Sequence, residues 1–246
     1  MSYVFELPLL QAISDWQRGG DASQNRKRGI ALKAACASLP PEYRSSALCC
    51  FRQIALPKGG VWDLIGEDRL SEKISSWTTS IEVAKAFKGG VPPEGQGYQG
   101  TILCLHPPPC SVIVNLSKLY RNPAFTEAIE RNRNAINGYS DGAGRWKNSQ
   151  SEVVLEIDAV TPEDIYSLGG HSSSLDELVA QAADLVYRRS STFEEQQALL
   201  LQAEQVGITA GPRWLNVDAT RRVLAKTKPQ AERLNEIKRQ QEKTAE

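Results

Sequence analysis

The stretch "WKNSQSEVVLEIDAV", residues 146–160, predicts a strand at the centre of the fold. Val153, Leu155 and Ile157 follow one another in two-residue steps, which is typical of a strand with one face on a hydrophobic core. Gln150 and Glu152 are also two residues apart, so we expect both side chains on the same side of this strand. An amide beside a carboxylate at a strand mouth is either solvated surface or half of an active site, and the rest of the chain decides between these interpretations.

The composition is that of a globular protein without a strong overall charge. Of the 246 residues, 41% are hydrophobic and 24% are charged, and 29 basic residues balance 29 acidic ones. No overall field attracts nucleic acid or an anionic membrane, so any such preference must be local. We expect no membrane association, because no apolar run is long enough to cross a bilayer and residues 1–16 lack the basic segment of a secretory signal.

Cysteine and histidine usage argues against several kinds of site. The five cysteines are an odd number without paired C-x-x-C motifs, so we expect reduced, buried thiols in a cytoplasm and no metal site. The chain has only two histidines, which leaves little material for a histidine base beside a nucleophile. His106 precedes three prolines and is expected to be structural.

The pattern along the chain predicts an α+β fold. Helical spacing of apolar residues predicts two helices within residues 1–44. Strands are then predicted at residues 46–56, 75–80, 101–106, 111–116 and 151–160. Between them we expect a helix over residues 80–90, with Ser80 as its N-cap, and another over residues 122–136. Many short strands with few helices between them predict two packed, mainly antiparallel sheets with a cleft between them in residues 45–170.

The last third of the sequence predicts helices alone. Thr192 and Glu195 have capping-box spacing at the start of one of them, and Pro229 is expected to interrupt the last. We therefore divide the chain into a domain of residues 1–170, its helical lead-in of residues 1–44, and a helical C-terminal extension of residues 171–246.

Arg52 is the first of three polar features in otherwise apolar strands. It shares a predicted strand face with Leu48, Cys50, Ile54 and Leu56. An arginine on such a face is costly to bury without an anion. One interpretation is a salt bridge to a local carboxylate, or a guanidinium that reaches water at the strand end. The other is a planar donor fork for a phosphate or a sugar hydroxyl.

The other two features are the hydroxyl-rich segment "SSWTTS", residues 75–80, and Gln150-x-Glu152. Taken singly, the first is explained by strand propensity and an N-cap, and the second by a polar strand start. Their order along the chain, after Arg52, gives the functional interpretation more weight.

In that order, the three features resemble the Arg–Ser–Glu class of mono-ADP-ribosyltransferases. In that family an arginine on an early strand is followed by a Ser-Thr-Ser strand leading into a helix, then by a loop and a strand that begins Gln-x-Glu or Glu-x-Glu. Here the segments "CCFRQIAL", "SWTTSIEVAKAF" and "GYSDGAGRWKNSQSEVVLEI" carry the resemblance, over residues 45–160. The chain departs from the family in having Thr78 for the first serine and no arginine between Lys88 and Gly100.

The resemblance implies a fold, a substrate and a set of roles. The fold is an ADP-ribosyltransferase-like split β-sandwich with N-terminal helices, and the substrate is NAD, with no metal. Glu152 is the catalytic carboxylate that stabilises an oxocarbenium-like ribose cation, oriented by Thr78 or Ser80. The residues implied in NAD binding are Arg52, Thr78, Thr79, Ser80, Phe87 and Lys88, with Lys88 in place of the missing arginine.

Gln150 is implied to hold the acceptor of ADP-ribose. In the family, glutamate at this position goes with arginine targets, whereas glutamine goes with amide targets on proteins or with nucleobases. Arg145 and Lys147 flank Trp146, so a base is expected to stack on Trp146 while the cations meet phosphate. The other interpretation is that Trp146 packs under the loop or inserts into a protein target. With Tyr139 in the same loop, these residues favour nucleic acid as the acceptor and disfavour arginine.

The sequence therefore predicts a toxin- or effector-like, NAD-dependent mono-ADP-ribosyltransferase that modifies nucleic acid or a non-arginine protein side chain. It is expected in the cytoplasm, as a bacterial or phage-encoded protein or as one delivered into a host. Two alternatives stay open: an NAD glycohydrolase, and a catalytically inactive member of the fold that binds NAD, nucleic acid or a partner. Three roles stay open for residues 171–246: contact with the target, contact with an antidote or partner protein, or contact with the catalytic core alone.

Overall fold

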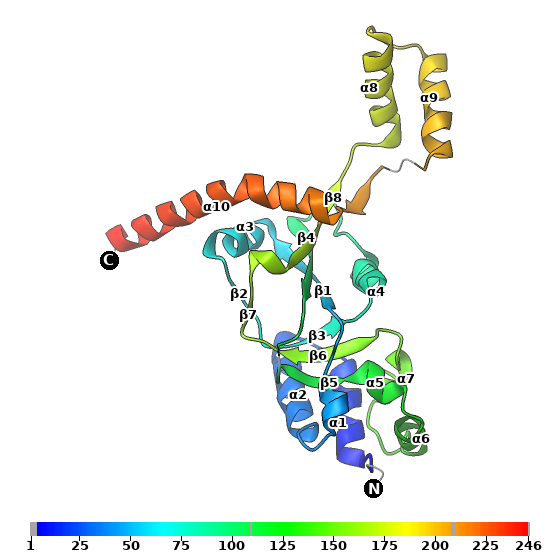
Figure 1. Cartoon of the computed structure of the whole chain (residues 1–246), viewed down its shortest axis with the longest axis vertical. Coiled ribbons are helices and arrows are strands. Elements are labelled where there is room, and N and C mark those ends of the chain that lie inside the picture. The colour runs from blue at the N-terminus through cyan, green and yellow to red at the C-terminus, as the bar shows by residue number, and fades with distance from the viewer. Residues whose placement is uncertain (1–3, 109, 208–209, 246) are drawn as a thin grey trace.

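The structure is a computed structural model that describes residues 4–108, 110–207 and 210–245. Helices lie at both ends of an antiparallel sheet, and one helical hairpin projects from it (Figure 1). This combination of helices and antiparallel strands confirms the predicted α+β class.

Seven strands form the main sheet, each antiparallel to its neighbours. From edge to edge they are β5 (Val112–Asn115), β6 (Glu152–Glu156), β3 (Ile74–Thr78), β1 (Cys50–Pro57), β4 (Tyr98–Leu105), β8 (Ile165–His171) and β9 (Pro212–Trp214). A separate two-stranded sheet pairs β2 (Leu70–Ser71) with β7 (Ala159–Val160). Single turns of 3-10 helix lie at Pro41–Arg44, Phe87–Gly89 and Pro162–Asp164.

The main sheet divides between β1 and β3. These strands are in register only at Phe51 and Thr78. In contrast, β1 pairs with β4 over its whole length, and β3 pairs with β6 over its whole length. The strands β5, β6 and β3 therefore form one half of the sheet, and β1, β4, β8 and β9 form the other.

Strand β6 is buried on both faces, whereas the sequence predicted one buried face. Val153 and Leu155 lie in a core cluster with Trp77, and Val154 lies in a second cluster with Leu10. All three β6 side chains are fully buried. Helices cover the second face of this half of the sheet, so its central strand is apolar on both sides.

Five helices accompany the half of the sheet formed by β5, β6 and β3: α1 (Leu7–Gln17), α2 (Ala22–Ala35), α5 (Leu116–Tyr120), α6 (Pro123–Arg131) and α7 (Ala143–Trp146). Helix α1 buries Leu9, Leu10, Ile13 and Trp16, which recur at helical spacing. Helix α2 starts with a capping box between Asp21 and Gln24. The predicted helical lead-in is thus part of the core of this half.

The other half of the sheet packs against α3 (Lys58–Glu67) and α10 (Val217–Ala245), while α4 (Ile81–Ala86) lies beside β1 and β3. The sequence analysis predicted no helix where α3 lies, and Gly59 and Gly60 near its start have low helix propensity. The helix forms nevertheless, since Val61, Leu64 and Ile65 bury one face against the sheet and α10.

Helix α10 runs through Pro229, so the predicted interruption is wrong. A proline inside a helix costs about 3 kcal/mol. Tertiary contacts offset this cost, because Ala231 is buried against α3 and two ion pairs join the helices, Lys228 to Asp68 and Lys238 to Asp63.

Helices α8 (Leu175–Tyr187) and α9 (Phe193–Gln205) form the projecting hairpin (Figure 1). Both start with a capping box, and the box at Thr192 and Glu195 is the predicted one. The hairpin is inserted between β8 and β9, which pair directly at its base through His171 and Pro212. Strand β9 and helix α10 follow the hairpin and pack with the main sheet, so the predicted extension of residues 171–246 includes parts of the main fold. The domain boundary at residue 171 stays a prediction.

Three smaller predictions are wrong at the ends of elements. Leu48 precedes β1 and is 61% exposed, so it does not share the face of Arg52. Helix α4 ends at Ala86, short of the helix predicted over residues 80–90, and Phe87 just beyond its end is 44% exposed. All cysteines are free, but Cys110 is exposed rather than buried.

Candidate functional site

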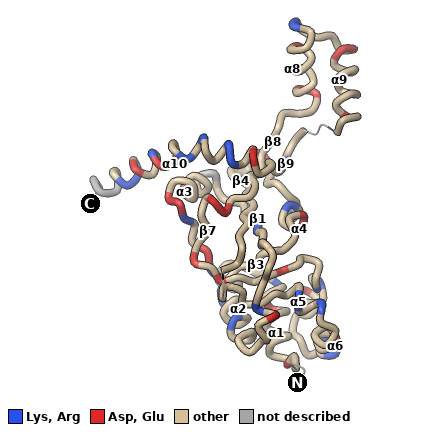
Figure 2. The backbone as a smooth tube through the Cα atoms, in the orientation of Figure 1, with Lys and Arg blue, Asp and Glu red and all other residues tan. Residues whose placement is uncertain are grey.

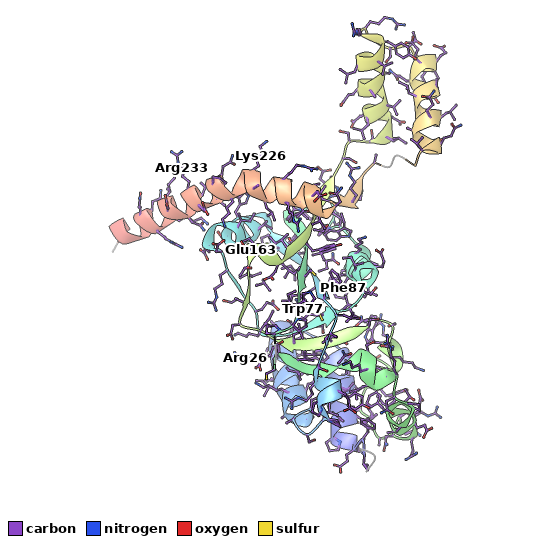
Figure 3. The ribbon with its side chains drawn as sticks, in the orientation of Figure 1. Arg26, Trp77, Phe87, Glu163, Lys226 and Arg233 are labelled. Carbon is purple, nitrogen blue, oxygen red and sulfur yellow. The ribbon has the colours of Figure 1, made fainter. Side chains whose placement is uncertain are left out.

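A small pocket of about 70 Å³ lies where the sheet divides. It is bounded by β1, β3, α4 and the start of β6, and Figure 3 marks Trp77 and Phe87 on its wall. The pocket brings together five residues that the sequence selected from separate segments: Arg52, Thr78, Phe87, Gln150 and Glu152.

Glu152 is the most constrained of these residues. It is 5% exposed, and its Oε1 accepts hydrogen bonds from Ser76 Oγ at 2.5 Å and from Trp16 Nε1 at 2.8 Å. Its Oε2 is buried without a hydrogen-bond partner among the described residues. Burial raises the pKa of this carboxyl, whereas the hydrogen bonds from Ser76 and Trp16, together with the nearby Gln17 amide, act in the opposite direction.

The hydroxyl that contacts Glu152 is that of Ser76, whereas the sequence predicted Thr78 or Ser80. Thr78 Oγ1 instead donates to the Gln150 carbonyl at 2.7 Å, and Ser80 caps α4 by accepting from Val83 N. Ser76 and Thr78 share a face of β3, which places both hydroxyls near β6. This shared face was the signal for Ser76, but nothing in the sequence ranks Ser76 above Thr78.

Arg52 is already engaged with protein groups. Its Nη1 donates to the Ser76 carbonyl at 2.8 Å, and its Nε lies 3.6 Å from Glu72 Oε2. The local salt bridge that the sequence allowed is therefore present. The guanidinium also lines the pocket, and within the described chain its Nη2 makes no hydrogen bond, so one edge is left for a ligand.

Gln150 reaches the pocket by a different route from the predicted one. Strand β6 begins only at Glu152, and Ser151 has a left-handed backbone with φ of 46°. Strand alternation therefore does not relate Gln150 to Glu152. A turn fixed by Thr78 and Thr79, which donate to the carbonyls of Gln150 and Ser151, places Gln150 on the pocket wall. A non-glycine residue in this conformation is strained, and such strain is frequent at functional sites.

The remaining predicted acceptor residues lie in the segment before Gln150, with Arg145 and Trp146 in the short helix α7, and they are outside the residues that line the pocket. The Arg145 guanidinium stacks 4.6 Å from the centre of the Trp146 ring. Tyr139 donates to Glu130 at 2.8 Å, and Lys147 forms an ion pair with the same carboxylate at 3.5 Å. The Tyr139 hydrogen bond, helped by Lys147, lowers the pKa of Glu130.

A wider groove of about 860 Å³ adjoins the pocket and shares Arg52, Ser76 and Phe87 with it. Lys88 lines this groove, with its ammonium 5.8 Å from the centre of the Phe87 ring. Lys88 also has a left-handed backbone, with φ of 50°. The groove and the pocket together make one elongated hollow with Arg52 at the junction.

No cluster of three or more potential metal ligands occurs in the described part of the chain. Among the same residues, the helices are too short or too polar to span a bilayer. Compared with protein-family models, with curated proteins and with solved structures, the chain matches none, so its function has to be inferred from the geometry of this hollow.

Proposed function

We propose that this chain is an NAD-dependent mono-ADP-ribosyltransferase built on a split β-sandwich. The observation that carries the proposal is the buried Glu152 carboxylate in the pocket, with Oε1 held by Ser76 and Trp16 and Oε2 left unpartnered among the described residues. The division of the sheet at Phe51 and Thr78 supports the proposed fold, because it opens the hollow that the substrate requires.

The geometry of Glu152 suits cleavage of the bond between nicotinamide and ribose. This cleavage develops positive charge on the ribose, as glycoside cleavage does. Nicotinamide leaves without help from a protein acid, so the reaction requires a fixed negative charge. A carboxylate in a site with little water stabilises such charge strongly. In the proposed reaction Oε2 accepts a hydrogen bond from a ribose hydroxyl, the ribose carbon bonds to the acceptor, and the acceptor loses a proton.

Arg52 is proposed to bind the NAD phosphates. It stands at the junction of pocket and groove, so a dinucleotide with its nicotinamide end near Glu152 would pass its phosphates beside the guanidinium. The free Nη2 edge supplies a charge-assisted donor. Lys88 and Phe87 border the groove beyond, where the rest of the dinucleotide would lie.

Gln150 is proposed to hold the acceptor, with nucleic acid favoured over a non-arginine protein side chain. An amide both donates and accepts, which suits a base edge and offers no charge to a guanidinium. Arg145 stacked on Trp146 forms a cationic, aromatic platform in the short helix α7 that precedes Gln150. A base that replaces the guanidinium on this ring would gain about 1–3 kcal/mol from stacking.

The proposal is tested by incubating the protein with labelled NAD and a whole-cell lysate, followed by separation of DNA, RNA and protein. We expect label in nucleic acid, and a loss of about 100- to 1000-fold in both transfer and NAD hydrolysis for Glu152→Gln. Gln150→Ala should lose transfer but keep hydrolysis by water. Near-normal turnover by a folded Glu152→Gln protein would exclude the proposed activity, and label in protein alone would change only the acceptor class.

A further inference from the structure

The Glu152 carboxylate is held by donors from two distant parts of the chain. Ser76 lies on the neighbouring strand β3, whereas Trp16 lies in the last turn of α1, 136 residues before Glu152. Trp16 is 8% exposed, and its indole N–H donates and cannot accept, so burial requires an acceptor for it. A carboxylate held by one donor still pivots about that bond, and a second donor from another direction fixes its plane.

Helix α1 is itself anchored to the loop that precedes β6. Ser14 Oγ accepts from Ala143 N at 3.3 Å, and Gln17 Nε2 donates to the Lys147 carbonyl at 3.3 Å. Gly142 fits only because it lacks a side chain, since an added Cβ would lie 2.2 Å from the Ser14 carbonyl oxygen. The end of α1 therefore holds a fixed position relative to both the acceptor loop and Glu152.

Both donors act on the same carboxylate oxygen. Oε1 accepts from Ser76 and Trp16, so Oε2 is the oxygen left for a substrate hydroxyl. The other titratable groups near this carboxylate are Tyr120 on α5, which donates to Gln17 Oε1 at 2.8 Å, and Arg52 on β1, whose charge is shared with Glu72. Neither of them makes a hydrogen bond to Glu152 in the described structure.

We infer that Trp16 is a positioning residue for Glu152: its indole N–H, delivered by α1, orients the carboxylate so that Oε2 faces the ribose. This inference rests on the proposed function. On this inference helix α1 positions the proposed catalytic carboxylate, whereas the sequence predicted only a helical lead-in.

The test compares Trp16→Phe, which removes the N–H and keeps an aromatic ring in the core, with the wild type. The kcat for NAD cleavage should fall about 10- to 100-fold, the loss typical of one hydrogen bond to a charged group, while KM for NAD changes little. The pKa of Glu152, followed by NMR of the carboxyl carbon without NAD, should rise because a donor to the ionised form is gone. Trp214→Phe is the matched control, because Trp214 donates to the Lys85 carbonyl at 3.0 Å and does not line the pocket.

A second variant covers the case in which Trp16→Phe does not fold. Replacing Trp16 by β-(3-benzothienyl)alanine keeps the shape of the indole and removes only the N–H. An unchanged Glu152 pKa and unchanged kcat in a folded variant of either kind would overturn the inference. The wild type could also cleave no NAD while the Trp16 variant still has a raised Glu152 pKa. That result would support the contact between Trp16 and Glu152 and refute the proposed function.

Discussion

At Glu152, burial and hydrogen bonding act on the carboxyl in opposite directions, and burial has the larger effect on its pKa. Because stabilisation of the ribose cation needs the ionised form, NAD cleavage should rise with pH through the raised pKa and level off above it. The measurement is kcat/KM for NAD as a function of pH. A profile already flat from about pH 5, where an ordinary glutamate is ionised, would contradict this prediction.

The same pKa shift predicts how stability depends on pH. The folded-state pKa of Glu152 lies above that of the unfolded chain, so the stabilisation is fully present below the unfolded pKa and is lost as pH rises through the folded pKa. Glu152→Gln should therefore have a higher free energy of unfolding in urea than the wild type at pH 8. The difference should shrink toward acidic pH, and a difference independent of pH would argue against a strained, ionised Glu152.

Ser76 and Thr78 are expected to have separable effects. Ser76→Ala removes a donor to Glu152 and should slow both transfer and hydrolysis about tenfold or more. Thr78→Val keeps the shape of the side chain but releases the Gln150 carbonyl, so it should reduce transfer more than hydrolysis. Initial rates of both reactions, measured on the same preparations, make the comparison. An equal loss of transfer and hydrolysis in Thr78→Val would mean that Thr78 and Ser76 do not have separate roles.

For single residues, the sequence predicted which side chains line the pocket better than it predicted which side chains contact one another. Arg52, Gln150 and Glu152 meet as expected, because the order of the short strands along the chain restricts which segments lie side by side. Gln150 reaches the pocket through the turn at Ser151 and not through strand alternation. Ser76 was not separable from Thr78, since hydroxyls two residues apart share a strand face. Trp16 carried no local signal at all, because its contact with Glu152 depends on how α1 docks on the sheet.

The packing of α3 on α10 predicts opposite effects for two glycines of one helix. A Cβ on Gly66 would lie 2.8 Å from the Ala231 carbonyl oxygen of α10, a backbone atom that cannot move alone. Gly66→Ala should therefore destabilise the protein by about 1–3 kcal/mol through overpacking. Gly59→Ala is the control, because nothing lies within 4 Å of its added Cβ and helix propensity favours alanine. The measurement is the free energy of unfolding of the two variants in urea. Equal stability would mean that α10 is not closely packed against α3 at Gly66.

The elements that the sequence predicted well are those with local signals. Ser80 and Thr192 cap helices as expected, because a cap is decided within four residues. Helix α3 and the unbroken path of α10 through Pro229 were missed, since both depend on burial against another element. The glycines of α3 and Pro229 in α10 disfavour a helix locally, and tertiary packing outweighs this preference.

The α8–α9 hairpin is predicted to be dispensable for the fold and for NAD cleavage. It is inserted at the paired end of β8 and β9, so an Asn-Gly turn in place of residues 172–211 should close the same strand pair. The melting temperature should change by no more than about 4 °C, which corresponds to roughly 1 kcal/mol. Thermal unfolding and NAD hydrolysis of this variant are the measurements, and loss of folding would show that the hairpin supports the sheet.

The hairpin remains the proposed surface for a partner protein. Leu185, Val186 and Phe193 are 79%, 64% and 71% exposed near the tip where α8 ends and α9 begins. Residues 175–206 contain six carboxylates and two arginines, and acidic positions mark both helices in Figure 2. This charge disfavours nucleic acid, so an acceptor of that kind would approach the cleft and not the hairpin.

The long separation of Trp16 and Glu152 along the chain also has a consequence for biosynthesis. Helix α1 is synthesised before β6, and 136 residues must be added after Trp16 before the carboxylate exists. At about 5–20 residues per second this delay is on the order of ten seconds. A nascent chain therefore carries the indole without the group it orients, and the producing cell's NAD meets a competent carboxylate only after β6 has been made and has entered the sheet.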